Sequence, residues 1–434
     1  MSDLIEARVL KGFRDFLPDA EIERHLLTET LENSFRSFGF VPIDTPALEY
    51  AEILLGKGGG ETEKQVYRFK DHGERDVALR FDLTVPFARF MAEHRAELTL
   101  PFKRYHIAKV WRGENTQRGR YREFTQCDFD IVGSESASAD FEILLMMREA
   151  LLSIGVGDLS IRMNHRGIFN RFLAYRGIAE KSVEILRTVD KLSKIGKDET
   201  LKLLTAMIGK EKAGAVLDFI EPKASFDETL AAMTIAAGGS AQDTQRLSML
   251  RSYMIDAGIA DVFVLDPSIT RGLDYYTGVV YETFLNELPS IGSVCSGGRY
   301  DDLANLYTKE RLSGVGASIG LDRLIAALEA LNRSKRIPSF ARVAIACLDE
   351  GLTGKYQLLA SKLRKVGIAC EVFTENKKPV QQYTLAEKKG ARWIILANST
   401  DLDTNRYTIR ELSSRTNHEN LDFAQALQLI KESP

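Results

Sequence analysis

The sequence lacks the features that mark secreted, membrane-spanning and zinc-binding proteins. Its four cysteines stand far apart and include no C-x-x-C pair, which argues against a disulfide scaffold or a zinc site and suits a reducing compartment. No apolar run reaches the roughly 18 residues that a membrane-spanning helix needs. The charged N-terminus MSDLIEARVLKGFRD has no apolar core of the kind found in secretory signals. These absences predict a cytoplasmic protein with no membrane partner.

The sequence also carries little net charge of either sign. The formal net charge is −3 over 434 residues, so no overall field indicates a nucleic-acid partner. The charge is uneven, since residues 338–434 hold 14 Lys and Arg against 11 Asp and Glu, and the rest of the chain holds 44 against 50. A mildly basic C-terminal part is compatible with phosphate binding. With 44% hydrophobic residues, the chain is long enough for two or three domains with buried cores.

Hydrophobic periodicity divides the chain into five segments. Residues 1–169 mix helical and strand-like stretches, whereas residues 170–257 have helical periodicity with few strand signals. Strands resume in residues 258–331, and the stretch NRSKRIPSF, residues 332–340, has the composition of a linker. Residues 341–434 alternate strand and helix, which predicts a small α/β domain with a largely parallel sheet. The helical segment is therefore predicted to be an insertion in a strand-rich core.

A large hairpin is predicted where two strand-like stretches, residues 102–112 and 121–132, flank a polar connection rich in arginine and glycine. Alternation along the second strand places Gln126, Asp128 and Asp130 on one face. Such a row of polar side chains is expected either on the floor of a polar pocket or on the solvated face of an edge hairpin. The arginines at the tip suit phosphate oxygens, because a planar guanidinium can bind two of them at once.

The segment VALRFDLT, residues 77–84, is predicted to form another strand. Alternation then places Arg80, Asp82 and Thr84 on one face. A carboxylate and a hydroxyl two residues apart can hold an ammonium group. The alternative is a wet sheet surface with no ligand.

A tyrosine pair marks a further candidate segment, TRGLDYYTGVVYE, in which Arg271 precedes Tyr275 and Tyr276. Tyrosines beside charged groups can pack against a flat ring and also donate hydrogen bonds to it. Downstream, CSGGRYDDL contains two glycines that would let a ligand approach the backbone closely. Arg299 in the same segment suits a structural ion pair as well as a ligand contact.

Two glycine-rich segments fail the patterns of nucleotide-binding loops. GVGASIGLDRL has the spacing G-x-G-x-x-x-G and lies too late in the chain for a dinucleotide fingerprint, and GKGGGET is not followed by a P-loop Gly-Lys-Ser/Thr. The six histidines show no metal-ligand spacing, and no G-x-S-x-G segment indicates a covalent nucleophile. The sequence therefore predicts neither a metal centre held by protein side chains nor a dinucleotide site.

Taken together, these segments resemble the class II aminoacyl-tRNA synthetases. FVPIDTPALEY around Pro46 is similar to motif 1, a dimer-interface element, and the hairpin with Arg112, Glu114 and Arg120 is similar to motif 2. GVGASIGLDRL with Arg323 is similar to motif 3. RGLDYYTG and GGRYDDL resemble signatures of the histidine subgroup, and FDLTVPFARF and YREFTQCDFDIVG resemble its eukaryote-like branch. The resemblance extends from KGFRDFLP near the start to the C-terminal segment.

The resemblance implies an α+β fold, in which a class II antiparallel sheet flanked by helices carries a helical insertion and a C-terminal α/β anticodon-binding domain. Residues 1–169 and 258–331 would then form the two parts of the catalytic core. The implied reaction is ATP-dependent ligation of L-histidine to tRNA(His) through a histidyl-adenylate, with release of pyrophosphate and AMP. The implied assembly is a homodimer, and Mg²⁺ would be bound together with ATP.

The resemblance also assigns roles to individual residues. The expected catalytic residues are Arg112 and Arg271. The residues expected to bind histidine are Asp82, Thr84, Arg112, Gln126, Asp130, Arg271, Tyr275 and Tyr276. The residues expected to bind ATP are Arg112, Glu114, Arg120 and Arg323. Gln117 is expected to approach the acceptor end of the tRNA.

Alternatives remain for the C-terminal domain and for the whole protein. Tyr383 and Tyr407, among basic residues, could stack on unpaired bases, or they could be core aromatics under a solvated surface. The rival identities are the non-catalytic synthetase paralogue that regulates histidine biosynthesis, a class II synthetase for another amino acid, and an RNA-binding module on the same fold. Arg271, the tyrosine pair and the C-terminal domain disfavour the first, and RGLDYYTG disfavours the second. The third is disfavoured because every motif has its catalytic residues.

Overall fold

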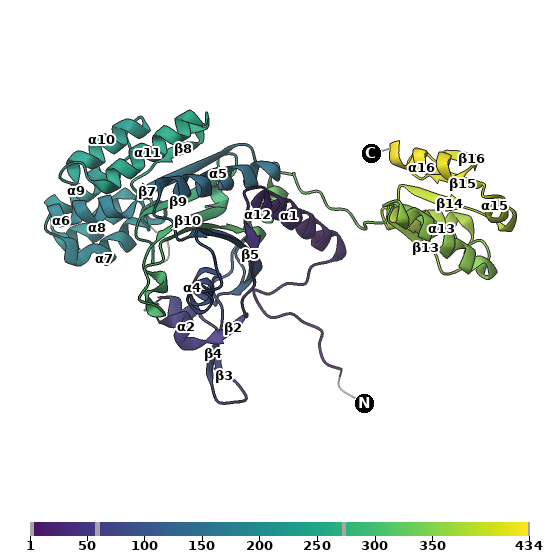
Figure 1. Cartoon of the computed structure of the whole chain (residues 1–434), viewed down its shortest axis with the longest axis horizontal. Helices are drawn as coiled ribbons and strands as arrows, with labels where there is room; N and C mark the ends of the chain where they lie inside the picture. Colours follow the sequence, from purple (N-terminus) through teal and green to yellow (C-terminus); the bar gives the residue numbers. More distant parts are fainter. Residues whose placement is uncertain (1–3, 57–60, 271–274, 433–434) are drawn as a thin grey trace. The chain divides into compact units, whose positions relative to one another are not determined.

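The computed structural model describes residues 4–56, 61–270 and 275–432. The chain divides into two compact units, one formed by Met1–Arg14 and Leu27–Ser334 and the other by Asp15–Leu26 and Lys335–Pro434 (Figure 1). Within the described residues, no helix is long and apolar enough to cross a membrane.

The first unit is organised around a large sheet, for which the described residues supply eight strands in the order β1-β5-β6-β11-β10-β9-β7-β8. Neighbouring strands are antiparallel except for the parallel pairs β1–β5 and β7–β8. The bounds are β1 Val41–Pro42, β5 Phe102–Trp111, β6 Glu123–Val132, β7 Leu159–His165, β8 Phe263–Leu265, β9 Val279–Leu285, β10 Cys295–Tyr300 and β11 Gly314–Gly320. The predicted hairpin is β5–β6, and β6 is a central strand because it pairs with β11 on its other side.

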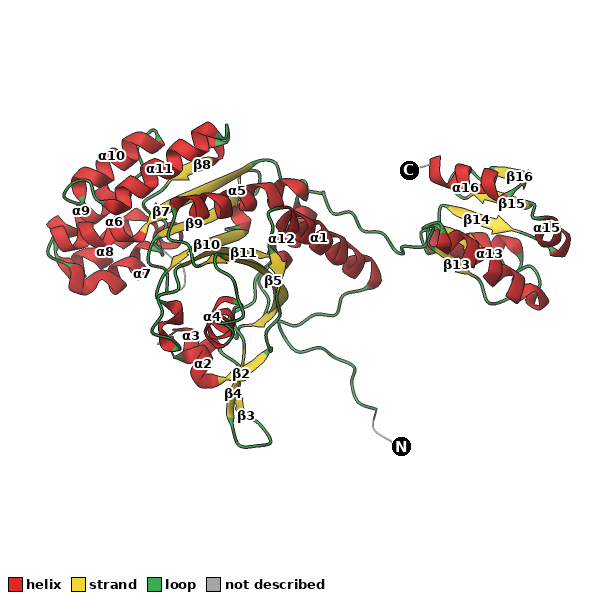
Figure 2. Cartoon of the chain, in the orientation of Figure 1, coloured by secondary structure: helices red, strands yellow, loops and turns green. Residues whose placement is uncertain are grey.

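Helices cover one face of this sheet (Figure 2). They bury its apolar side chains. α5 (Ala137–Ser153) and α12 (Leu321–Ala330) pack on β6 and β11, and α1 (Pro18–Ser37) adds Leu31 and Phe35 to the same core. The ring of Phe35 lies 5.0 Å from that of Phe129 on β6. The main core therefore lies directly behind the central strands.

A smaller sheet, β2-β4-β3, belongs to the same unit. Its strands are β2 Leu48–Tyr50, β3 Arg68–Lys70 and β4 Asp76–Leu79, and the helices near it are α2 Ala51–Leu55, α3 Glu61–Gln65 and α4 Thr84–Glu93. The strand predicted for residues 77–84 is thus wrong beyond Leu79, because the chain leaves the sheet there and starts α4 at Thr84. Arg80 does not share a face with Asp82, since its guanidinium donates to the carbonyl oxygens of Thr45 and Lys109.

The predicted helical segment lies between β7 and β8. It consists of α6 Arg166–Tyr175, α7 Ser182–Val189, α8 Leu192–Ile208, α9 Lys210–Ile220, α10 Phe226–Ala236 and α11 Gln242–Asp256. The helices form a bundle at the β7–β8 end of the sheet (Figure 1). Its core contains the stacked rings of Phe172 and Phe219, whose centroids are 4.2 Å apart. The bundle core is continuous with the core behind the sheet.

The second unit contains a sheet to which the described residues contribute five strands in the order β13-β12-β14-β15-β16. The strands are β12 Val343–Ile345, β13 Cys370–Val372, β14 Trp393–Leu396, β15 Tyr407–Glu411 and β16 Asn417–Leu421, and the helices are α13 Thr353–Lys365, α14 Pro379–Lys388, α15 Ser399–Thr404 and α16 Phe423–Glu432. β13, β12 and β14 are parallel, but β15 and β16 are antiparallel to their neighbours. The prediction of a largely parallel sheet is therefore right for three strands only. The turn from β15 to β16 is too short for the crossover that a parallel pair requires.

Candidate functional site

The face of the large sheet that the main core leaves open carries two adjoining cavities. Their shared lining makes them one continuous site, and it consists of Arg112, Arg120, Gln126, Ser293, Ser296, Ser318 and Arg323. To this shared lining the inner cavity, of about 300 Å³, adds four tyrosines and the carboxylates of Asp82, Asp128, Asp130 and Glu282, whereas the outer cavity, of about 200 Å³, adds the carboxylates of Glu114 and Asp322. Carboxylates therefore outnumber the three arginines in the inner compartment, and the arginines outnumber the carboxylates in the outer one.

The acidic floor of the inner cavity is built by β6. Gln126, Asp128 and Asp130 line the cavity and are 8%, 2% and 3% exposed, and the residues between them, Cys127 and Phe129, lie in the main core. Alternation predicted this polar row. Because β6 is a central strand with both faces buried, the row forms a pocket floor and not the solvated face of an edge hairpin.

Asp82 and Thr84 reach the inner cavity from the start of α4. The backbone N–H of Val85 donates to one carboxylate oxygen of Asp82 at 3.0 Å. The other oxygen of Asp82 is buried without a hydrogen-bond partner among the described residues. Thr84 and Asp128 meet across the cavity, with 3.5 Å between hydroxyl and carboxylate. The start of α4 thus places the carboxylate of Asp82 beside the polar residues of β6. A pocket role for Asp82 was predicted, but on a strand and not at the start of a helix.

Burial sets the protonation of these carboxylates. It raises the pKa of Asp82 to about 6, against the opposing effects of the Val85 N–H and of Arg112. It raises the pKa of Asp128 to about 7, with Asp130 adding to the shift and Arg104 opposing it. The ligand-free pocket therefore holds protons near neutral pH, which a cationic group would replace.

Tyr275 and Tyr276 line the same cavity, with their ring centroids 4.8 Å apart and the rings inclined at 63°. Burial raises the pKa of Tyr276, so the phenol keeps its proton and can donate a hydrogen bond. Arg271, the predicted catalytic arginine of this segment, lies outside the described residues.

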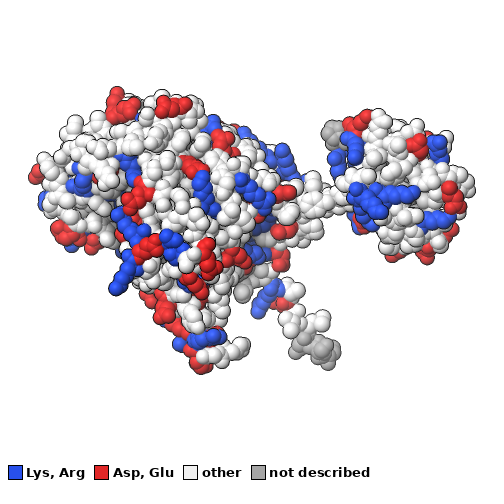
Figure 3. All heavy atoms as spheres, in the orientation of Figure 1, with Lys and Arg blue, Asp and Glu red and all other residues white. Residues whose placement is uncertain are grey.

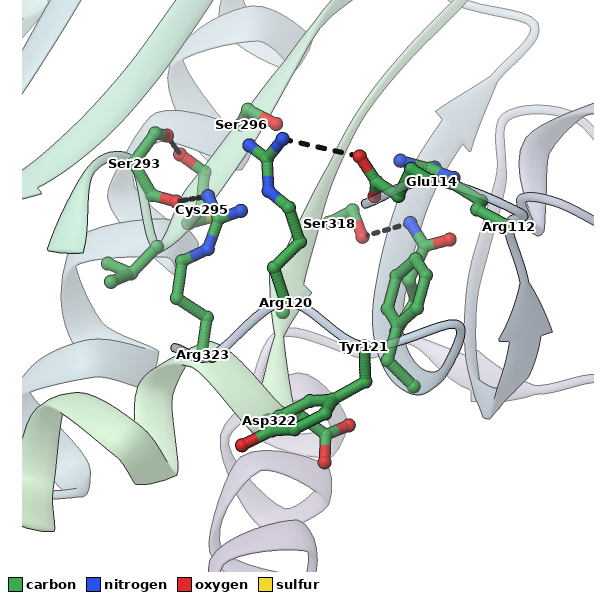
Figure 4. A pocket seen from close by; sticks show the side chains of 15 residues that line it. Arg112, Glu114, Arg120, Tyr121, Ser293, Cys295, Ser296, Ser318, Asp322 and Arg323 are labelled. Carbon is green, nitrogen blue, oxygen red and sulfur yellow. Dashed lines mark hydrogen bonds and ion pairs between the residues drawn. The ribbon is translucent and has the colours of Figure 1, made fainter. Parts of the chain in front are cut away.

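The outer cavity brings together the arginines of the β5–β6 hairpin and of α12 (Figure 4). Arg120 forms an ion pair with Glu114 at 3.2 Å, and Arg323 donates to the carbonyl oxygen of Ser293 at 2.5 Å. Arg112 donates from Nε to the carbonyl oxygen of Phe81 at 2.8 Å, at the boundary between the two cavities. Three guanidinium groups therefore converge where an anionic ligand would lie.

Gln117 occupies a different position. It is exposed at the hairpin tip, where its backbone pairs with that of Arg120, and it does not line either cavity. Figure 3 shows Lys and Arg interspersed with Asp and Glu over the visible surface of both units. In the second unit, Tyr407 is a core residue at 3% exposure, so only Tyr383 of the two tyrosines, under the guanidinium of Arg410, is partly accessible.

The structure adds site residues that sequence reasoning missed. Tyr300 donates its hydroxyl to Asp130 at 2.6 Å, and the guanidinium of Arg104, on β5, lies 2.7 Å from the other oxygen of that carboxylate. Ser318 accepts a hydrogen bond from the amide of Gln126 at 2.7 Å. The signal for Arg104 was its place opposite Asp130 in the hairpin register.

Arg299 and the glycines of CSGGRYDDL have structural roles. The guanidinium of Arg299 is buried and forms an ion pair with Asp140 at 2.7 Å, which settles the alternatives in favour of a structural partner. A Cβ on Gly297 would lie 2.1 Å from the carbonyl oxygen of Gly316 and 2.6 Å from the ring of Tyr281, and one on Gly298 would lie 2.7 Å from the carbonyl oxygen of Val279 and 2.9 Å from the ring of Tyr276. The neighbouring strands and tyrosines thus leave no room for a side chain at either glycine. Gly297 also lines the inner cavity, and the close approach of a ligand to its backbone stays a prediction.

Comparisons with known proteins agree with this site. A histidyl-tRNA synthetase family model matches residues 12–324, and an anticodon-binding domain model matches residues 342–433. A histidine–tRNA ligase of Treponema denticola is 54% identical over the whole of both chains. The chain belongs to the histidyl-tRNA synthetase family. Another member, a histidine–tRNA ligase of Rhodopirellula baltica, is 47% identical over 95% of each chain.

Solved structures of this family share the fold. The crystal structure of a histidyl-tRNA synthetase from Nostoc has a TM-score of 0.89 at 31% identity and covers 99% of this chain and 100% of its own. The Staphylococcus aureus histidyl-tRNA synthetase, at 21% identity and a TM-score of 0.72, shows likeness of fold alone. Membership of the class II synthetases and the α+β architecture expected from the motifs are confirmed.

Proposed function

We propose that this chain is a histidine–tRNA ligase, which activates L-histidine with ATP and transfers it to tRNA(His). The observation that carries the proposal is the joined site, in which an acidic compartment meets a basic one in a member of the histidyl-tRNA synthetase family. The acidic compartment suits an ammonium and an imidazole, and the basic compartment suits a triphosphate.

In the inner cavity, we assign Asp82 and Thr84, with the help of Gln126, to the α-amino group of histidine. Asp130 and Tyr276 would bind the two imidazole nitrogens, and Tyr275 would complete the wall beside the ring. An apolar competitor would leave these buried polar groups unpaired. Sites of this kind discriminate between substrates by roughly 10⁴-fold or more.

In the outer cavity, we assign Arg112 to the α-phosphate of ATP and the substrate carboxylate, Glu114 to the adenine, and Arg120 and Arg323 to the distal phosphates. The attacking carboxylate is already anionic, so its attack on the α-phosphate needs no general base. It needs in-line placement and positive charge around the phosphorus. Arg112 would supply that charge, together with Arg271.

A cation bound with ATP also fits this site. Mg²⁺ prefers carboxylate oxygens and water, and Glu282 is an acidic side chain that lines the inner cavity together with Arg120 and Arg323. Glu282 would hold the ion, which would neutralise phosphate charge when ATP is bound. The chain's own arginines would orient the phosphates.

The tRNA would contact three parts of the chain. The C-terminal unit, matched by the anticodon-binding model, would bind the anticodon. Gln117, exposed at the hairpin tip, would approach the acceptor end, and the α6–α11 bundle would lie along the acceptor arm. Salt-dependent affinity is expected, because contacts to phosphates release counterions.

We further propose a homodimer that works in the cytoplasm, where tRNA is charged. Its interface would include the motif 1 segment around Pro46, near which Leu48 and Tyr50 are exposed at 40% and 47%. Large apolar side chains exposed close together on a surface favour burial against a partner. Sedimentation analysis of the wild type and of Leu48→Asp would measure the assembly, and a monomeric wild type would overturn it.

The proposed function is tested by amino-acid-dependent ATP–pyrophosphate exchange with each of the twenty amino acids. Exchange with histidine alone, followed by charging of tRNA(His), is the expected result. Exchange with another amino acid would overturn the specificity and keep the class. A folded protein with no exchange would favour the non-catalytic regulatory paralogue.

A further inference from the structure

Arg104 is a fully buried arginine in the middle of β5, at 0% exposure. It lies directly opposite Asp130 in the antiparallel pairing of β5 with β6, so the two side chains project from the same face of the sheet. Nothing in the roles assigned above uses this cation. A buried guanidinium is costly to keep away from water, so its surroundings indicate what it does.

The contacts of Arg104 point toward the substrate pocket. Its Nη2 lies 2.7 Å from an oxygen of Asp130 and 3.5 Å from the carbonyl oxygen of Leu83, and its guanidinium carbon lies 4.2 Å from the ring centre of Phe87. Its Nε and Nη1 have no hydrogen-bond partner among the described residues. Among the described residues, Asp130 is the carboxylate with which Arg104 forms an ion pair, and the ring of Phe87 packs against the guanidinium.

Asp130 is held from two other directions. The hydroxyl of Tyr300 on β10 donates to its second oxygen at 2.6 Å. Gly316, which faces Asp130 in the β6–β11 pairing, leaves the space that this carboxylate fills, since a Cβ there would lie 2.0 Å from that oxygen. The carboxylate therefore has a single position, with one oxygen on Arg104 and the other on Tyr300.

We propose that Arg104 is a positioning residue for substrate recognition, which favours the ionised form of Asp130 and holds it in one orientation so that Asp130 accepts a hydrogen bond from the imidazole N–H of histidine. The inference rests on the proposed function, because it takes Asp130 as the group that reads the imidazole. A carboxylate held on two sides keeps lone pairs that can accept a hydrogen bond from a ligand. A protonated carboxyl group would instead donate a hydrogen bond, and it would then select the imidazole tautomer whose facing nitrogen accepts one.

The charge balance around Asp130 supports this role. Burial raises the pKa of Asp130, and Arg104 provides the largest opposing effect, ahead of the hydrogen bond from Tyr300. The ionisable groups that face Asp130 come from four elements or their flanks, namely Arg104 on β5, Asp128 on β6, Tyr276 before β9, Tyr281 on β9 and Tyr300 on β10. Among the described residues, Arg104 is the cation that lowers the pKa of Asp130, so its loss raises that pKa further.

The test uses histidine-dependent ATP–pyrophosphate exchange over a range of pH with Arg104→Met, which keeps much of the volume and removes the charge. Loss of one charge-assisted contact predicts a rise of about 10- to 100-fold in the KM for histidine. The kcat and the KM for ATP stay near their wild-type values. The acidic limb of kcat/KM for histidine moves to higher pH, because Asp130 then loses its proton only at higher pH.

Two further variants make the outcome specific. Arg104→Lys restores a cation and returns the acidic limb toward its wild-type position. Asp130→Asn removes the group through which Arg104 acts, so adding Arg104→Met to it raises the KM for histidine little further. Replacing both members of a buried ion pair is tolerated better than removing one. The double variant therefore carries the test if Arg104→Met alone does not fold.

An unmoved acidic limb, a KM for ATP that rises in step with that for histidine, or additive effects in the double variant would overturn the proposal. Each would show that Arg104 supports the fold as a whole. Exchange of the wild type with a different amino acid would overturn the proposed function instead. The coupling of Arg104 to Asp130 would then be measured with that amino acid.

Discussion

Thr84 is the first residue of α4, and its hydroxyl lies 3.5 Å from the carboxylate of Asp128 in the middle of β6. The two residues belong to different layers of the first unit, and both line the inner cavity. Their contact joins the polar groups of the α4 start to those of β6 at the wall of the cavity.

Asp128→Asn should stabilise the ligand-free protein at and above neutral pH. The pKa of Asp128 is about 7 in the folded chain and 3.8 by its ordinary value, so the folded state binds more protons between pH 4 and 7. Its contribution to the free energy of unfolding therefore falls as pH rises through this window. Denaturant unfolding at pH 8 should show a gain of roughly 1–3 kcal/mol for the variant, and a smaller gain at pH 5. An equal gain at both pH values would contradict the assignment.

Gly316→Ala should remove recognition of histidine and also lower the stability of the fold. A Cβ at this position would lie 2.0 Å from an oxygen of Asp130 and 2.7 Å from the carbonyl oxygen of Phe129, so both the carboxylate and the β6–β11 pairing must shift. We expect kcat/KM for histidine to fall by about 100-fold or more, since displacing a group that positions the substrate has a cost of this size. Gly157→Ala is the matched control, because a Cβ there meets nothing within 4 Å. Equal kinetics in the two variants would count against the role of Asp130.

Arg323→Ala should raise the KM for ATP and spare the KM for histidine. Arg323 lines both cavities, and its guanidinium donates to the carbonyl oxygen of Ser293. Loss of a charge-assisted contact to a phosphate predicts a rise of about 10- to 100-fold in the KM for ATP. Arg333→Ala serves as a control, since this arginine forms an ion pair with Glu287 at the surface. A change in the KM for histidine of the same size would contradict the division of the site.

His165→Asn should reduce the loss of stability in acid. Burial lowers the pKa of His165 from 6.5 to about 4, so the unfolded chain binds more protons between these values. The stability contributed by the neutral imidazole is present above pH 6.5 and is lost as pH falls toward 4. Asparagine can keep the hydrogen bond that the imidazole accepts from the N–H of Gly167 at the start of α6. Between pH 7 and pH 4.5 the free energy of unfolding should fall less in the variant than in the wild type, by roughly 1–3 kcal/mol.

The sequence allowed much of the fold and site to be predicted, because alternation along a strand fixes which side chains share a face. Gln126 and Asp130 could be placed together from their spacing alone. Asp82 could be placed with them only through the family motifs, since the residues around it favour a strand. The start of α4 was signalled by Thr84 and by Pro86 in the first turn, where proline suits a helix start.

Arg104 and Tyr300 could not be predicted as pocket residues from spacing. Arg104 alternates with His106 along β5, a pattern typical of a solvated strand face. Only the layer carrying Phe87 on α4, which covers this face, turns the pattern into a buried one. Tyr300 meets Asp130 across β11, and the order of strands in a sheet is not encoded in local pattern. The hairpin register alone brings Arg104 opposite Asp130, but the burial of Arg104 and the contact of Tyr300 depend on tertiary assembly.

The alternation of polar and apolar residues along β6 determines how this protein loses activity on heating. Its polar residues face the substrate pocket, and Cys127, Phe129 and Ile131, which alternate with them, lie in the main core. A movement that displaces Asp128 or Asp130 must therefore open the core behind the strand. Heating should extinguish amino-acid activation and near-ultraviolet circular dichroism over the same temperature interval, with no folded but inactive state between them.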